Sequence, residues 1–500
     1  MDNIISHIGE DFITLFFDGL DKCFNDFLKD PLKFAQFELN VKKSVDALGR
    51  QMIKVGLEAI NSYFKRSADR VRDWYVERND MKQLTTTFGD VTYVKTLFRH
   101  KTKKTDDGKE IMCYLVDKVV GMTPGQRVSD AAHAMVYAEA AQTSYRRAGE
   151  SFSDTAGISK QAVMDILHST DFPIDYEAPK ERKKLKYLYI DADEDHISLQ
   201  YNEERGDLVK GPTGRKNNGA MTKLVYIYEG IEKVSPESKR HRLVNPHYFC
   251  EVEEDDIWGR VYSYILDTYD ISQVKVIYIN ADGGAWIKSG MKQIAGARYV
   301  LDGFHLSKYM GKMTAHMMDS AYDAKVQLCD EIKQGNKDSF IAKAKEIASY
   351  SEDQKIQEAV LAAAGYILSN WMAAKRRLEH KDGVAACSAE GHVSHVLACR
   401  MSTPALAWCR HGADVMAHLR AYYLNKGNLL ELVRYQKREL PKAAGAEDIA
   451  YSVSDAIRDS TDHRSKVQQM IGKYSSSMGG TIVGLSDWFR DALINGGHMS

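Results

Sequence analysis

Hydrophobic residues change their spacing several times along the 500-residue chain, and each change marks a boundary between predicted elements. Up to about residue 80 they recur every three or four positions, which predicts amphipathic helices. Thr85–Arg99 has the composition of a strand, and Met112–Val120 would close a hairpin with it. We therefore expect a small α+β domain over residues 1–120.

Helical spacing returns in residues 121–176. Ala131–Arg147 predicts one helix, whereas Ser151–Leu167 predicts a short helix, a turn at Gly157 and a second helix opened by Ser159. Helix, glycine-containing turn and helix is the layout of a helix-turn-helix DNA-binding motif. A plain hairpin of two helices has the same pattern, so both interpretations stay open at this point.

Residues 177–305 alternate between buried strands and helices. The pattern predicts three strands, a helix, a strand, a helix and a strand, in the order Leu185–Asp193, Ile197–Tyr201, Lys223–Ile231, Asp255–Tyr269, Lys275–Asn280, Trp286–Ile294 and Ala297–Asp302. This is the order of a ribonuclease H-like fold, a mixed sheet flanked by helices. We therefore expect an α/β protein with a ribonuclease H-like mixed sheet.

The remainder of the chain is predicted to be helical. Residues 306–386 are rich in Ala, Lys, Glu and Gln, which predicts an all-α insertion of three or four helices. Residues 387–412 would return to the sheet domain with a further helix. Residues 413–500 would then form a helical C-terminal region.

Composition excludes several classes of protein. A hydrophobic fraction of 44% and a charged fraction of 27% are ordinary for a soluble globular chain. Charged residues interrupt the N-terminal apolar run, and no later stretch is long and apolar enough for a membrane span. The seven cysteines are scattered and odd in number, which argues against a disulfide framework. We expect a cytoplasmic protein with no membrane partner.

The net charge of −1 does not indicate a nucleic-acid partner, but local basic clusters matter more. Counterion release depends on the lysines and arginines that touch phosphates, although a single charge run is usually only a solvated face. Three basic clusters occur, at residues 99–104, 180–186 and 210–223. From the second and third we predict DNA contacts by Lys180, Arg182, Lys183, Lys184, Lys186, Arg215 and Lys216.

Two predicted strands each run into an acid, the first at Asp193 and the fourth at Asp282. The ends of these strands lie side by side in the expected fold, and Glu390 opens a later helix that would pack across the sheet. Two Mg²⁺ ions about 3.5–4 Å apart can cut and rejoin a phosphodiester. Mg²⁺ is held by a few carboxylates and the substrate phosphate. The sequence thus predicts a catalytic metal site at Asp193, Asp282 and Glu390, with Mn²⁺ as a substitute for Mg²⁺.

The first acid has other interpretations. Asp191 and Asp193 alternate as in a calcium loop, but His196 replaces the required glycine and Asn202 the required glutamate. Asp is also a common turn residue. Asp191 is the alternative first acid, because it faces the same side of the strand as Asp193, one pleat repeat deeper.

Other candidate residues lie near the predicted acids. Asp302 and His305 follow the fifth strand, which should adjoin the fourth, so we expect them to support the site without being primary ligands. A zinc site is disfavoured because the spacing matches no standard finger and no C-x₂-C pair is present. Its ligands would be Cys387, His392, His395 and Cys399.

Taken together, these motifs resemble the ISLre insertion-sequence transposases of bacteria, within the Mutator-like group of DDE enzymes. The resemblance covers nearly the whole chain. It rests on Ser144–Arg146, Ala192–His196, Ala281–Ile287, Asp302–His305 and the unusual segment Ser388–His395. It implies a ribonuclease H-like domain whose carboxylate triad is Asp193, Asp282 and Glu390, a helical insertion before the glutamate, and an Asp-x-x-His support at Asp302 and His305.

The resemblance also implies binding to the terminal inverted repeats of the protein's own mobile element, action on target DNA, and a homo-oligomer on DNA. One departure concerns Thr403-Pro404-Ala405-Leu406, where the family tends to have Ser-Arg-Pro-Met, so that an arginine beside the glutamate helix is missing. Two other functions stay open. They are a catalytically silent DNA-binding protein, and a ribonuclease H-like nuclease without strand transfer.

Overall fold

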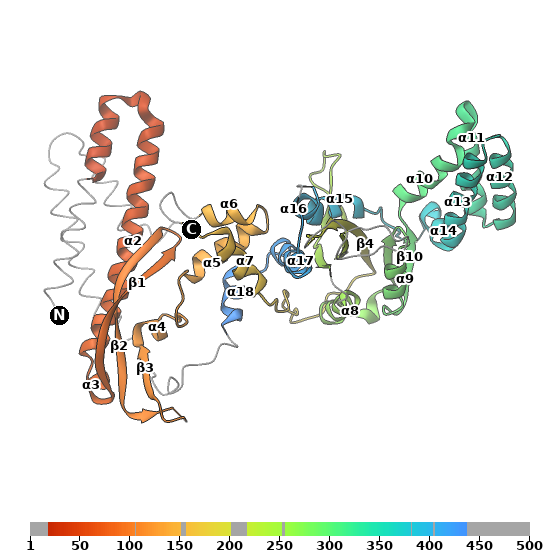
Figure 1. Cartoon of the computed structure of the whole chain (residues 1–500). Coiled ribbons are helices and arrows are strands. Elements are labelled where there is room, and N and C mark those ends of the chain that lie inside the picture. The colour runs from red at the N-terminus through yellow and green to blue at the C-terminus, as the bar shows by residue number, and fades with distance from the viewer. Residues whose placement is uncertain are drawn as a thin grey trace. The chain divides into compact units, whose positions relative to one another are not determined.

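The structure is a computed structural model. It describes residues 19–105, 107–151, 157–201, 218–252, 256–381, 383–403 and 406–437. Its contacts divide the chain into two compact units. The first contains the described residues up to Ala132, and the second contains residues 133–151 and those from Ile158 onward (Figure 1).

The first unit joins a long helix to a three-stranded antiparallel sheet of order β1-β2-β3. Its elements are η1 Pro31–Lys33, α2 Phe34–Arg66, α3 Ala68–Asp73, β1 Trp74–Thr86, β2 Gly89–Lys104, β3 Glu110–Tyr114 and α4 Leu115–Val119. Leu57 and Phe64 of α2 are buried against the sheet, which forms the core of this unit. The described part of this unit thus combines helices with an antiparallel sheet.

Strand β1 begins at Trp74, inside the region that the sequence predicts as helical, so that part of the prediction is wrong. β1 is an edge strand, and most of its side chains from Tyr75 to Gln83 are exposed. An edge strand with few buried positions carries little apolar alternation, which is the signal that predicts a strand.

The second unit is built on a five-stranded mixed sheet of order β10-β9-β4-β5-β8. The pairs β10–β9 and β9–β4 are parallel, while β4–β5 and β5–β8 are antiparallel. The strands are β4 Tyr187–Ser198, β5 Gly219–Tyr228, β8 His247–Glu251, β9 Val276–Ala281 and β10 Ala297–Leu301, and a separate hairpin consists of β6 Gly230–Lys233 and β7 His241–Val244. An α/β fold with a mixed sheet is therefore confirmed.

The sheet differs from the prediction in two strands, one predicted wrongly and one not predicted. Ile197–Tyr201 is not a separate strand, because β4 continues through the acidic residues and pairs with β5 from Tyr189 to Ser198. The third strand along the chain is β8, which the sequence analysis missed. The run Asp193–His196 has the composition of a turn, but pairing with β5 keeps it extended.

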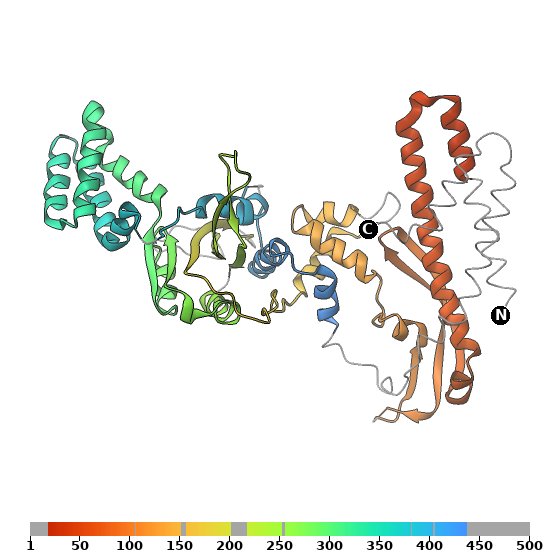
Figure 2. The same cartoon turned by 180° about the vertical axis from the view of Figure 1, so that it is seen from behind.

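Helices surround the sheet. Those of the second unit are α5 Asp130–Ala140, which begins in the first unit, α6 Tyr145–Glu150, α7 Lys160–His168, α8 Ile257–Thr268, η2 Ile271–Gln273, α9 Ala285–Met291, α10 Gly303–Thr314, η3 Ala315–Ser320, α11 Ala321–Gln334, α12 Lys337–Ser349, α13 Gln354–Ser369, α14 Trp371–Glu379, α15 Ala389–Val393, the π-turn η4 Ser394–Ala398, α16 Cys399–Met401, α17 Arg410–Leu424 and α18 Leu429–Gln436. Where three or four helices are expected over residues 306–386, the structure has the five α-helices α10–α14, the first of which begins at Gly303, and they gather beyond the β10 edge of the sheet (Figure 2).

The region predicted as a helix-turn-helix differs in detail. Ala131–Arg147 is not one helix, because the Ser144 side chain caps a new helix by accepting the Arg147 N–H. Ser159 caps α7 as predicted, but the helix expected after Ser151 lies outside the described residues. Val163 and Leu167 of α7 are fully buried, and α7 packs on α6 and α17.

None of the helices in the described ranges has both the length and the hydrophobicity that crossing a bilayer requires.

Candidate active site on the tyrosine-lined face of the sheet

The two faces of strand β4 have different surroundings. Leu188, Ile190 and Ala192 point into the main hydrophobic core. Tyr189, Asp191 and Asp193 alternate with them and therefore point to the opposite face. This face also carries Tyr226 and Tyr228 of β5 and Tyr278 and Asn280 of β9. The Tyr189 ring stacks on those of Tyr228 and Tyr278, with centroid distances of 5.3 and 6.0 Å. We call it the tyrosine-lined face.

Strand register places the first two predicted acids side by side. β4 and β9 are parallel and pair Asp191 with Asn280 and Ala192 with Ala281, so Asp193 and Asp282 follow at neighbouring positions. The chain turns sharply after Asp282, at Gly283 with a φ of 96°. A Cβ atom on Gly283 would lie 2.7 Å from the Tyr299 hydroxyl, so only glycine fits this turn.

Glu390 lies on the same face of the sheet as the aspartates. The backbone N–H of Ser388 donates to Oδ2 of Asp191 at 2.9 Å, although the two residues are 197 positions apart. Helix α15 begins at the next residue, and exposed Glu390 is in its first turn. The helix predicted after Ser388 is thus present, and it continues through a π-turn to Met401.

The three acids interact electrostatically. Burial raises the pKa of Asp193 to about 7, and the charges of Asp282 and Glu390 act in the same direction. The Glu194 backbone N–H and the His305 ring oppose that rise. Asp193 therefore interacts with two carboxylates that are distant in sequence, Asp282 at 89 and Glu390 at 197 positions along the chain.

The donor set of this site consists of hard carboxylate oxygens, which fit Mg²⁺ and Mn²⁺ better than softer metals. Within the described residues, no group of three or more His, Cys, Asp or Glu side chains forms a ready-made metal site. Mg²⁺ keeps several waters and is usually held by one or two carboxylates together with substrate phosphates. The chemistry of the residues therefore fits a Mg²⁺ ion that is completed by substrate.

Asp302 and His305 border the acids. Asp302 caps α10 by accepting the N–H groups of Phe304 and His305, and its Oδ2 lies 3.0 Å from Nδ1 of His305. The hydrogen bond with Asp302 raises the pKa of His305 against the effect of burial, and Asp282 and Asp193 add to the rise. Burial opposes ionisation of Asp302, yet hydrogen bonds from His305 and the backbone hold its pKa below the ordinary value.

Asp191 is more deeply placed than the three acids. Its side chain is fully buried and accepts hydrogen bonds from Tyr226, Tyr228, Asn280 and Ser388. Burial raises the pKa of Asp191 although these bonds favour its charged form. Hydrogen bonds thus occupy both oxygens of this enclosed carboxylate, which favours Asp193 over Asp191 as the predicted first acid.

Residues considered as alternative zinc ligands make other contacts in the structure. The His392 ring stacks on Tyr226 at 4.5 Å, and its Nδ1 lies 3.0 Å from the Ser388 carbonyl. The Cys399 thiol donates to the His395 carbonyl. The part of the chain that the structure describes contains no cluster that could hold zinc.

The basic cluster at residues 180–186 is exposed, but it directly precedes β4 and so lies at the end of that strand that is remote from the acids. At about 3.3 Å per residue, Lys186 and Asp193 are separated by roughly 20 Å along the strand. Lys183 forms an ion pair with Glu229 at 2.6 Å. Lys180, Arg182 and Lys184 are exposed as well, whereas Arg215 and Lys216 lie outside the described residues.

The polar residues around Asp191 were not predictable as a group from the sequence; they are Tyr226, Tyr228, Asn280, Arg377 and Ser388. One signal was present, because tyrosines alternate with aliphatic residues in β5 and so predict hydroxyl groups on a single face. Arg377 gave no comparable signal, since a cation on an amphipathic helix usually points to solvent.

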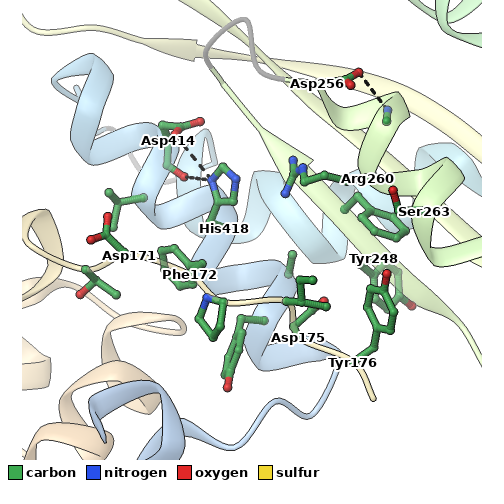
Figure 3. A pocket seen from close by; sticks show the side chains of 18 of the residues that line it. Asp171, Phe172, Asp175, Tyr176, Tyr248, Asp256, Arg260, Ser263, Asp414 and His418 are labelled. Carbon is green, nitrogen blue, oxygen red and sulfur yellow. Dashed lines mark hydrogen bonds and ion pairs between the residues drawn. The ribbon is translucent and has the colours of Figure 1, made fainter. Parts of the chain in front are cut away.

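A pocket of about 580 Å³ lies elsewhere in the second unit, between residues 170–176, α8, β8 and α17 (Figure 3). Asp171, Asp175, Asp256 and Asp414 line it together with Arg260 and His418. His418 Nδ1 lies 3.0 Å from the Asp414 carbonyl. The pocket adjoins the β8 edge of the sheet and contains none of the three predicted catalytic acids.

The chain belongs to the uncharacterised protein family UPF0236, whose model matches residues 27–439. A UPF0236 protein of Caldanaerobacter subterraneus subsp. tengcongensis is 32% identical over 458 residues, which cover 90% of this chain and 91% of that protein. A UPF0236 protein of Streptococcus gallolyticus, encoded in a vanSb 3' region, is 28% identical and covers 75% of this chain and 78% of its own. The name of the Caldanaerobacter protein joins many loci of one genome, so the family occurs there in multiple copies.

One solved structure with some similarity is the Drosophila P element transposase strand transfer complex. The match has 10% identity and a TM-score of 0.22, and it covers 76% of this chain and 95% of that one. A likeness this weak establishes neither fold nor function.

Proposed function

We propose that this member of the UPF0236 family is the DDE transposase of a bacterial insertion sequence, with a ribonuclease H-like catalytic domain in its second unit. The observation that supports the proposal most is the electrostatic interaction of Asp193 with both Asp282 and Glu390. The charges of the other two acids add to burial in raising the pKa of Asp193. A divalent cation would remove this repulsion, which supports a metal-dependent reaction.

In this proposal the three carboxylates would hold Mg²⁺, or Mn²⁺ in its place. Such ions activate a nucleophile and neutralise the charge that develops around phosphorus. Asp193 lies on β4, Asp282 directly follows β9, and Glu390 lies on α15. Asp302 orients the His305 ring and favours its protonated form, so His305 would offer a positive charge beside the scissile phosphate.

The proposed substrates are the terminal inverted repeats of the mobile element and a target DNA, acted on by a homo-oligomer. The multiple copies of the family in one genome support this proposal, because mobile elements spread in this way. The helix-turn-helix assignment remains a prediction. The exposed positions of α7 include Lys160 and Gln161 but also Asp165, so they do not form a basic surface.

The test is a cleavage and joining assay with full-length protein, Mg²⁺ and a labelled duplex that carries the repeats flanking its own gene. We expect nicked ends and joined products, both lost in Asp282→Asn. The matched control is Asp338→Asn, which removes an exposed acid from the start of α12 in the same unit and should leave both products unchanged. Nicks without joined products would indicate a nuclease. Binding without cleavage would indicate a catalytically silent DNA-binding protein, and either outcome would overturn the proposal.

A further inference from the structure

A buried polar network lies directly beneath the three acids. Asp191 is at its centre, and its two oxygens accept four hydrogen bonds shorter than 3.2 Å. The donors are the hydroxyl of Tyr226 at 2.7 Å, the hydroxyl of Tyr228 at 3.1 Å, the amide of Asn280 at 2.6 Å and the backbone N–H of Ser388 at 2.9 Å. Asp191, Tyr226, Tyr228 and Asn280 are fully buried.

The network extends to the inserted helices through Arg377 of α14, which is only 6% exposed. Its Nη2 donates to Oδ1 of Asn280 at 2.7 Å, so one amide links Arg377 to Asp191. Its Nε donates to the Leu301 carbonyl at 2.8 Å and its Nη1 to the Ala385 carbonyl at 2.6 Å. The guanidinium therefore joins the end of β10, strand β9 and the segment that leads to Ser388.

The segment before α15 is attached to the sheet by side chains. Residues 384–388 belong to no helix or strand. The Tyr228 hydroxyl donates to the Ala386 carbonyl, and the Tyr226 and Ser388 hydroxyls are 2.8 Å apart. His392 then stacks on the Tyr226 ring. Ser388 and His392, two residues before and two residues after Glu390, thus both contact Tyr226. These two contacts fix the position of Glu390.

The spacing of the network matches that of the acids. Asp191 precedes Asp193 by two residues on β4, Asn280 precedes Asp282 by two on the β9 side, and Ser388 precedes Glu390 by two. On a strand, residues two apart share a face and are separated by about 7 Å. Asp191 therefore lies one layer below Asp193 on β4, and Asn280 is the last but one residue of β9, which Asp282 directly follows.

We propose that Asp191, Asn280 and Arg377 are positioning residues, which set the third carboxylate relative to the first two through Ser388. This inference rests on the proposed function of the three acids. Hydrogen bonds are directional, whereas apolar packing tolerates small shifts, so a segment without regular structure acquires a fixed register only from such bonds. Arg377 lies on α14, the last helix of the insertion, and donates to the Ala385 carbonyl in the segment that leads back to the sheet. The folded insertion therefore contributes to the site.

The test uses Mn²⁺ binding to the full chain, measured by electron paramagnetic resonance without DNA. Tyr226→Phe removes one hydroxyl that bonds both Asp191 and Ser388, and we expect about fivefold weaker Mn²⁺ binding. Tyr137→Phe is the matched control, because Tyr137 is 1% exposed and its hydroxyl lies 2.8 Å from that of Thr170, away from the acids. Mn²⁺ binding should be unchanged in this control.

A double-mutant cycle separates positioning from general destabilisation. In a Glu390→Gln background, Asp191→Asn should add nothing to the loss of Mn²⁺ affinity, because Asp191 acts through Glu390. Equal losses with and without Glu390, or equal losses in Tyr226→Phe and Tyr137→Phe, would overturn this inference alone. If neither Asp193→Asn nor Glu390→Gln weakens Mn²⁺ binding, the proposed function is wrong and the inference falls with it.

Discussion

Replacing Arg377 with methionine should destabilise the second unit strongly. Methionine keeps much of the aliphatic volume but removes three hydrogen bonds, to Leu301, Ala385 and Asn280. Hydrogen bonds to a charged group contribute about 1.5–3 kcal/mol each, while removal of a buried cation returns part of its desolvation cost. We therefore expect a loss of about 3 kcal/mol in the free energy of unfolding, near the lower end of the usual range for breaking a buried charged network.

The neighbouring residue gives a matched control. Arg376 is on the same helix and makes one hydrogen bond, to the Tyr299 carbonyl at 2.9 Å. Its side chain is half-buried rather than enclosed, so Arg376→Met should cost about 1 kcal/mol. The two substitutions have the same chemistry and differ in the network that they interrupt.

Urea unfolding of the full-length protein, followed by circular dichroism, measures both variants. The two units need not unfold together, so the transition must be fitted for each unit. We expect Arg377→Met to lower the midpoint of one transition and to leave the other unchanged. Losses for the two arginine variants that agree within about 0.5 kcal/mol would refute the reasoning, because the three bonds of Arg377 would then add no stability.

Three further predictions concern DNA and catalysis. Asp282→Asn should abolish cleavage but bind end-repeat DNA at least as tightly as wild type in a fluorescence anisotropy titration, because one negative charge near the phosphates is gone; weaker binding would contradict this. His305→Ala should lower the cleavage rate about 10–100-fold, with melting temperature and DNA affinity unchanged, and a wild-type rate would make His305 a core residue only. Lys184→Ala should reduce the slope of log affinity against log salt by about 0.9, whereas Lys183→Ala should not, because Lys183 is paired with Glu229. Slopes equal to that of wild type in both variants would show that residues 180–186 are only a solvated surface.

Regular elements with one strongly apolar face were predictable from the sequence. Strands β4, β9 and β10 and helix α8 are buried on a continuous apolar face, and their predicted ranges agree with the structure to within a few residues, except at the end of β4. Elements without such a face were missed. Strand β1 is mostly exposed, and β8 follows a hairpin in a polar region, so neither shows the apolar alternation that indicates a strand.

The sequence offered candidate acids, but it did not indicate the residues that surround Asp191. An acid at the end of an apolar run stands out in a sequence, as Asp193 and Asp282 do. The partners of Asp191 are a tyrosine pair, an asparagine and a backbone N–H, and their roles depend on strand register and on a contact 197 positions away. No local pattern contains that contact, because it arises only when the inserted helices fold and return the chain to the sheet.

The long insertion between β10 and α15 raises the question of how Glu390 reaches a fixed place. The entropic cost of closing a loop grows only with the logarithm of its length, so an insertion of this size costs little by itself. A fixed position of Glu390 therefore requires contacts where the chain comes back to the sheet. Arg377 holds the chain at Ala385, Asp191 holds it at Ser388, and Tyr226 holds it at His392. The position of Glu390 therefore depends on side chains beneath it rather than on the length of the chain before it, and the insertion can vary as long as those three contacts remain.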